Sequence, residues 1–120
     1  MSTGIQPGDV VLVNLPTHEP KGHEQEGLRP AIIVAVPSGY LRFPIVLVVP
    51  VTSQGGNWAN QNPILYHQIP RGTGGLPRPS VALIDQVRAV DMKRITTYLG
   101  ALEQQLLQNI RHSLVELITA

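Results

Sequence analysis

The chain of 120 residues contains no cysteine and few aromatic side chains: one Trp, one Phe and three Tyr. The absence of cysteine excludes disulfide bonds, thiolate nucleophiles and thiolate metal sites, and it fits a protein of the reducing cytoplasm. Because aromatic residues are scarce, Trp58 is the one obvious platform on which a planar ligand would stack.

The chain also lacks a charge imbalance and a long apolar run. The formal net charge is +1, so nucleic-acid binding cannot be argued from charge alone. The longest apolar run, 44–51, is too short to cross a bilayer, and residues 1–10 are polar, so we expect no membrane span and no signal peptide. The length fits one domain, 1–120, that buries about two-thirds of its unfolded surface.

Eleven glycines and eleven prolines separate short runs that are rich in valine and isoleucine. Runs of this composition, bounded by turn residues, are typical of buried strands. They predict strands at 9–15, 31–36, 44–51, 64–69, 80–84 and 86–90. Many short strands joined by turns favour a mainly β protein, built as a sandwich or a small barrel.

The C-terminal segment changes to a helical period. Leucine, isoleucine and valine recur there at steps of three and four residues and form one apolar stripe, which predicts a helix over about 101–118. The stripe favours packing of this helix on the sheet, and binding of a partner is the alternative.

Three segments are predicted to be loops. The segment 16–28 is polar, contains two His and three Glu, and is long enough to act as a flexible flap between the first two strands. The segment 53–62 is a second polar loop. The sequence GTGG at 72–75 lacks the context of a nucleotide-binding loop and predicts a flexible hairpin turn.

Two residues suggest chemistry. Arg29 lies where the first polar loop becomes a buried strand, and Thr52 lies at the end of the next apolar run. A cation and a hydroxyl at one end of a sheet can share a phosphate group. The alternatives are a solvated or ion-paired arginine and a threonine that caps a turn.

Four blocks resemble the MazF/PemK family of toxin endoribonucleases, in the family's order. They are PGDVV at 7–11, GHEQEGLRPA at 22–31, PVTS at 50–53 and VALIDQVRAVD at 81–91, followed by Arg94. The resemblance implies an SH3-like small barrel with a C-terminal helix, as in MazF, CcdB and Kid, and a homodimer. It also implies sequence-selective cleavage of single-stranded RNA without a metal or cofactor, and neutralisation by a cognate antitoxin with an acidic or disordered C-terminal segment.

The resemblance implies that Arg29 and Thr52 are catalytic, and their chemistry fits. Cleavage of RNA without a metal uses the 2′-hydroxyl as nucleophile, so the protein supplies charge stabilisation and proton transfer. Arg29 matches phosphate oxygens but is a poor proton carrier, because a guanidinium group holds its proton firmly. Thr52 corresponds to the family's active-site hydroxyl, which orients the scissile phosphate or donates to it.

His23 and Glu24 complete the predicted catalytic set. His23 stands where family members often carry serine, and an imidazole titrates near neutrality, so it is a proton-transfer candidate whose alternative is a mobile surface side chain. Three roles are open for Glu24: it holds the flap, it forms an ion pair with Arg29, or it is a solvated acidic residue of the loop. His18, His67 and His112 show no metal-ligand spacing, so no metal site is expected.

A further set of polar and aromatic residues is predicted to contact RNA. RNA in single strands is read by stacking and by hydrogen bonds to exposed base edges. The predicted RNA-binding residues are Gln25, Ser53, Gln54, Trp58, Arg78, Gln86 and Arg88. For Trp58, anchoring the loop or filling a dimer interface are equal alternatives.

The sequence leaves two other functional classes open. The first is a toxin of the same fold that poisons DNA gyrase without chemistry. That group uses a tryptophan near the C-terminus, whereas this chain ends LITA at 117–120 with no aromatic residue nearby. The second is an inactive barrel that only binds its antitoxin.

Overall fold

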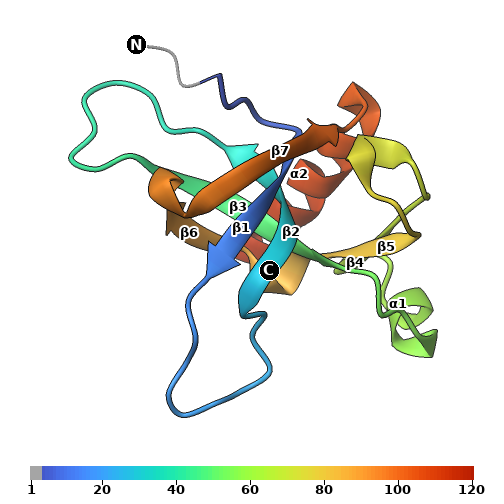
Figure 1. Ribbon diagram of the computed structural model, residues 1–120. Helices are drawn as coiled ribbons and strands as arrows, with labels where there is room; N and C mark the ends of the chain where they lie inside the picture. The colour runs from blue at the N-terminus through green and yellow to red at the C-terminus, as the bar shows by residue number, and fades with distance from the viewer. Residues whose placement is uncertain (1–3) are drawn as a thin grey trace.

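The computed structural model describes residues 4–120, which form a seven-stranded antiparallel sheet with a long helix on one face (Figure 1). The strands are β1 (Asp9–Leu15), β2 (Gly27–Ala35), β3 (Ile45–Thr52), β4 (Tyr66–Ile69), β5 (Ser80–Leu83), β6 (Arg88–Asp91) and β7 (Ile95–Ala101). The helices are α1 (Asn57–Gln61) and α2 (Gln104–Thr119). Within residues 4–120, no helix is long and apolar enough to cross a membrane.

Strand β3 organises the sheet. The order is β4-β5-β3-β2-β1-β7, and β6 pairs with the first half of β3 while β5 pairs with its last two residues. In the part of the chain that the structure describes, the pairings end at β4 and β7 and do not close. The predicted mainly β fold with a C-terminal helix is confirmed, whereas a closed barrel is not.

The central strands are buried on both faces, which explains their continuous apolar sequences. On β2, Ile32 and Val34 join Val49 and Ile110 in a cluster between the sheet and α2. Ala31 and the other alternate residues of β1, β2 and β3 form a second cluster on the opposite face. A shift of one residue in pairing would exchange the two sets, so burial fixes the register of these strands.

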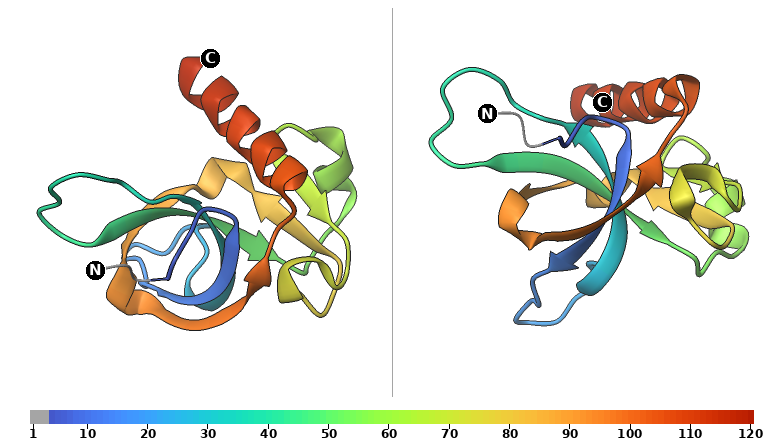
Figure 2. Two further views of the ribbon diagram at one scale, coloured as in Figure 1. Left: turned by 90° about the horizontal axis from the view of Figure 1, so that it is seen from above. Right: turned by 45° about the horizontal axis from the view of Figure 1, so that its top comes forward.

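Helix α2 packs on the sheet with only part of the predicted stripe. Leu107 and Ile110 are buried, and Arg111 donates from Nε to the carbonyl of Val34 on β2 at 3.0 Å. The last turns project beyond the sheet (Figure 2), and Ile118 is 77% exposed. The helix begins at residue 104, because 101 still belongs to β7.

The segment 72–75 is not the loose hairpin turn that its glycines predicted. It forms a short 3-10 turn at Thr73–Gly75, and Gly74 is buried. Gly75 has a φ of +74°, and a Cβ there would collide with the carbonyl oxygen of Leu99 on β7. The glycines therefore allow two backbones to touch.

Strand β7 and helix α1 were not predicted as elements. Strand β7 is mostly exposed, and its sequence ITTYLGA does not alternate regularly, so its pairing with β1 leaves no local pattern. Helix α1 is a single turn inside the predicted polar loop 53–62, and it buries only Ala59.

Replacement of Gly75 by alanine is expected to lower the free energy of unfolding by at least about 2 kcal/mol, because left-handed strain adds to a collision with backbone. Gly39→Ala is the matched control, since Gly39 has a φ of +86° but no atom within 4 Å of the added Cβ. In urea denaturation, the control should lose only about 1 kcal/mol of the free energy of unfolding. Equal losses for both variants would contradict the close approach.

His67 joins β4 to α2. Its Nε2 lies 2.7 Å from the hydroxyl oxygen of the buried Ser113 and 3.1 Å from the carbonyl oxygen of Ile64. Burial lowers the pKa of the His67 imidazole, and the Ile64 carbonyl opposes part of this effect. The neutral imidazole is therefore the form that the folded protein favours.

The chain is expected to lose stability as the pH falls below about 6.5, the ordinary pKa of histidine, because the unfolded state then binds the proton that folded His67 resists. Above that pH the contribution of His67 is constant. Thermal melting between pH 7.5 and 5 should show a shallower decline for His67→Gln than for the unchanged protein. His23→Gln, at an exposed position of the loop between β1 and β2, is the control and should leave the decline as it was.

Candidate functional site

Strand register brings Arg29 and Thr52 together. Ala31 on β2 pairs with Pro50 on β3 in an antiparallel ladder. Continued two residues along each strand, this register sets Arg29 against Thr52. Residues two apart in a strand point to the same face, so both side chains lie on one face at this end of the sheet, and both line the same cleft.

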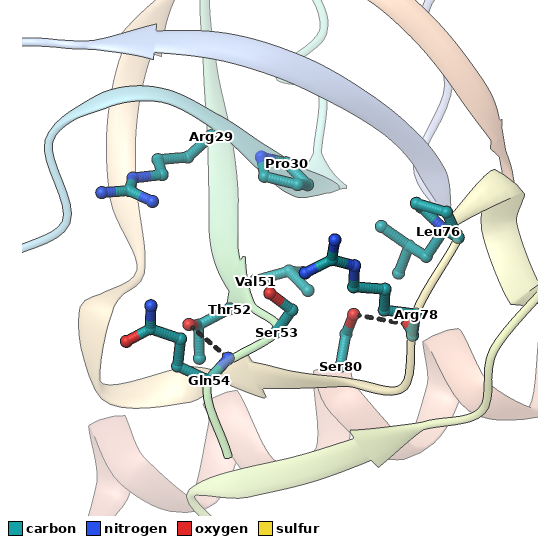
Figure 3. Close-up of a pocket in the computed structure, with 10 residues that line it drawn as sticks. Arg29, Pro30, Val51, Thr52, Ser53, Gln54, Leu76, Arg78 and Ser80 are labelled. Atoms are coloured by element: carbon teal, nitrogen blue, oxygen red, sulfur yellow. Dashed lines mark hydrogen bonds between the residues drawn. The ribbon is translucent and has the colours of Figure 1, made fainter.

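Both residues line a cleft of about 330 Å³, drawn in Figure 3. Arg29 lies on one side, Thr52, Ser53 and Gln54 lie on the other, and Arg78 extends toward Ser53 from the loop before β5. The complete lining is Arg29, Pro30, Val51, Thr52, Ser53, Gln54, Leu76, Pro77, Arg78 and Ser80. Two guanidinium groups in one cleft make an environment suited to an anion.

Short hydrogen bonds orient the two central side chains. Arg29 donates from Nε to the carbonyl of Glu26 at 2.9 Å, and no contact within residues 4–120 occupies its two terminal nitrogens. The Thr52 hydroxyl oxygen accepts from the backbone N–H of Gln54 at 3.1 Å, so its own proton remains available. The cleft thus presents oriented donors without partners.

The loop between β1 and β2 is held by Gln86 and Arg88. The Gln86 side chain accepts from the Gln25 N–H at 2.8 Å and donates to the His23 carbonyl at 3.3 Å. Arg88 donates to the Gln25 carbonyl at 3.1 Å. These two residues, predicted from the sequence to contact RNA, have their side chains engaged by the loop, which we call the clasped loop (residues 16–26).

His18 and Glu26 tie the two ends of the clasped loop together. The Glu26 carboxylate accepts from the His18 N–H at 2.9 Å, and this bond, with help from Lys21, holds the pKa of Glu26 below its ordinary value against slight desolvation. His18 Nε2 lies 3.4 Å from a terminal nitrogen of Arg88. Its Nδ1 lies 3.5 Å from the Glu26 carboxylate and has no hydrogen-bond partner within residues 4–120.

The remaining predicted residues lie in two adjoining recesses. His23, Gln25, Trp58 and Gln86 line a recess of about 440 Å³, which shares Thr52 and Gln54 with the main cleft. Glu24 lines another, of about 300 Å³, with His18 and Arg88. Within residues 4–120, Glu24 makes no ion pair with Arg29.

Sequence reasoning missed two residues of the site. Tyr66 and Asp85 line the recess of Trp58, and the Tyr66 hydroxyl donates to Asp85 Oδ2 at 2.9 Å. This bond raises the pKa of Tyr66. Asp85 lies inside the motif 81–91, so its position was a signal, whereas nothing local marked Tyr66. No cluster of three or more His, Cys, Asp or Glu suited to a metal occurs in the described part of the chain.

Comparison with known proteins places this fold and cleft in the class of toxins from type II toxin–antitoxin systems. A family described as "PemK-like, MazF-like toxin of type II toxin-antitoxin system" matches residues 6–118. The chain belongs to this family, as its four sequence blocks predicted.

Solved structures of such proteins share the fold. MazF from Deinococcus radiodurans superposes with a TM-score of 0.72 at 23% identity, over 97% of both chains. The Mycobacterium tuberculosis toxin MazF-mt6 gives 0.66 at 15% identity, over 95% of this chain and 97% of that one. An endoribonuclease in complex with its cognate antitoxin, from a mycobacterial species, superposes with a TM-score of 0.67 at 16% identity. The match covers 98% of this chain and 96% of that one.

Loss of Arg88 should open the clasped loop. Arg88→Ala removes the bond to the Gln25 carbonyl and the contact with His18, so trypsin should cut after Lys21 several-fold faster. Arg71→Ala, at an exposed position outside the site, is the control and should not change the rate. An unchanged rate in Arg88→Ala would show that the loop is held by other contacts.

Proposed function

We propose that the chain is a metal-independent endoribonuclease that cleaves single-stranded RNA at selected sequences. The observation that carries this proposal is the pair of unoccupied Arg29 nitrogens opposite the Thr52 hydroxyl in one cleft. In this arrangement a phosphodiester receives a bidentate cation and a neutral donor. Arg78 adds positive charge beside them.

The RNA supplies the nucleophile. The 2′-oxygen loses its proton and bonds to the adjacent phosphorus, the bond from phosphorus to the 5′-oxygen breaks, and the leaving 5′-oxygen takes up a proton. The products are a 2′,3′-cyclic phosphate and a 5′-hydroxyl. Arg29 and Arg78 stabilise the charge that builds on the phosphorane, and Thr52 orients a non-bridging oxygen.

Proton transfer is assigned to His23 or to Arg29. His23 lines the recess next to Thr52, and its imidazole is the kind of group that exchanges protons near neutral pH. If His23 transfers the proton, the pH–rate profile of His23→Ala loses a limb near neutrality. An unchanged profile would leave this step to Arg29.

The toxin is proposed to act as a homodimer in the cytoplasm and to be neutralised by a cognate antitoxin. A relative of this fold has been solved in complex with its cognate antitoxin, as its title states. A disordered acidic segment of such a partner would place carboxylates where phosphates bind, beside Arg29 and Arg78. Its binding would cover the cleft and rearrange the clasped loop.

Cleavage of a mixed-sequence single-stranded RNA in EDTA tests the proposal. Arg29→Ala should lower the cleavage rate by about 100-fold or more and Thr52→Val by about tenfold, because each removes a donor that acts on the transition state. Arg71→Ala and Thr97→Val remove a cation and a hydroxyl outside the site and should retain full activity. Folded protein that cuts no RNA would overturn the proposal, and a gyrase assay would follow.

A further inference from the structure

The recess beside the cleft has the dimensions of a base-binding site. Its volume of about 440 Å³ is ample for one planar ring system. Thr52 and Gln54 line both the cleft and the recess. A nucleotide whose phosphate lies between Arg29 and Thr52 therefore has its base within reach of the recess.

One wall of the recess is aromatic. Trp58 on α1 meets Tyr66 on β4 edge to face, with ring centroids 5.0 Å apart. Trp58 remains 39% exposed although it is the largest side chain of the region. A large ring that packs against a second ring and is still partly exposed is suited to stacking with a base.

Asp85 adds a negatively charged group to the recess beside the aromatic wall. Its Oδ2 accepts the Tyr66 hydroxyl, and Asp85 is an exposed residue whose Oδ1 is engaged by no other group within residues 4–120. A carboxylate next to the binding cleft repels phosphate and weakens RNA affinity. Its presence in the recess is explained if it accepts hydrogen bonds from the edge of a base.

We propose that the recess formed by Trp58, Tyr66 and Asp85 binds one base of the RNA and that Asp85 selects guanine there. Guanine presents two adjacent donors, N1–H and N2–H, that match the two oxygens of a carboxylate. Uracil and adenine each place acceptors beside a single donor group, and cytosine offers one amino group next to an acceptor. This inference rests on the proposed function for its substrate class.

Neighbouring amides fit the same base. Gln25 and Gln54 line the recess, and their side-chain N–H groups are donors for guanine O6. Gln86 also lines it, but both ends of its amide are engaged by the clasped loop. The base edge is thus read by Asp85 with help from the glutamines at the rim.

Trp58 supplies the readout, because it is the only tryptophan in the chain. Its fluorescence is titrated with the 5′-monophosphates of guanosine, cytidine, adenosine and uridine, and Kd is taken from the midpoint of each curve. Guanosine monophosphate should bind about tenfold more tightly than the adenosine, cytidine and uridine nucleotides, the size expected for one bidentate pair.

Asp85→Asn should remove this advantage, since an amide replaces one acceptor by a donor. The matched control is Asp91→Asn, at the start of a short turn outside the recess, where asparagine preserves the cap. Equal Kd values for the four nucleotides, or a guanine preference that survives Asp85→Asn, would overturn the proposal.

RNA cleavage separates this inference from the proposed function. With active protein, cut sites mapped on a mixed-sequence RNA should carry guanine at one fixed position near the cut, and Asp85→Asn should relax that position. Cut sites that do not change in Asp85→Asn would refute the guanine recess alone. Selective binding of guanosine monophosphate by a protein that cuts no RNA would support the recess and refute the ribonuclease.

Discussion

The antiparallel pairing of β2 with β3 is the constraint on which the site depends. The ladder sets Ala31 against Pro50, and the same register carries Arg29 to a place opposite Thr52. Both strands are buried on both faces, by α2 on one side and by the second apolar cluster on the other. A slip of one residue would turn Arg29 to the other face and bury the wrong side chains, so core packing protects the geometry of the cleft.

The clasped loop connects this register to the rest of the molecule. Arg29 is oriented by the carbonyl of Glu26, which belongs to that loop, and the loop is held in turn by Gln86 and Arg88. These contacts lie near the surface and outside the apolar core, so local opening of the loop does not require the core to unfold. A partner that displaces the loop would therefore also change the orientation of Arg29, without disturbing the apolar core.

Charge divides the site into two functions. Arg29 and Arg78 make the cleft cationic, which favours the phosphate backbone of any RNA and carries no sequence information. The adjoining recess contains Asp85, whose negative charge opposes that attraction, and in the proposed function a base with suitable donors offsets this cost. The net charge of the chain is only +1, so the positive charge of the cleft comes from the local placement of Arg29 and Arg78 and not from an excess of basic residues.

The sequence alone determined the family, the main strands and the pair Arg29 and Thr52, because each is marked by a motif or by the composition of a local run. Only the tertiary structure decided the rest of the site. It shows that Gln86 and Arg88, which the sequence predicted to contact RNA, hold a loop about sixty residues away, and that Tyr66 on β4 bonds to Asp85 just after β5. The tertiary structure also decided that the end of α2 is exposed and that β7 pairs with β1. Contacts between segments that are distant in the sequence leave no periodic pattern of apolar residues. Nor does the sequence show how much of a helix or strand its neighbours will cover. Both are decided only when the fold brings the segments together.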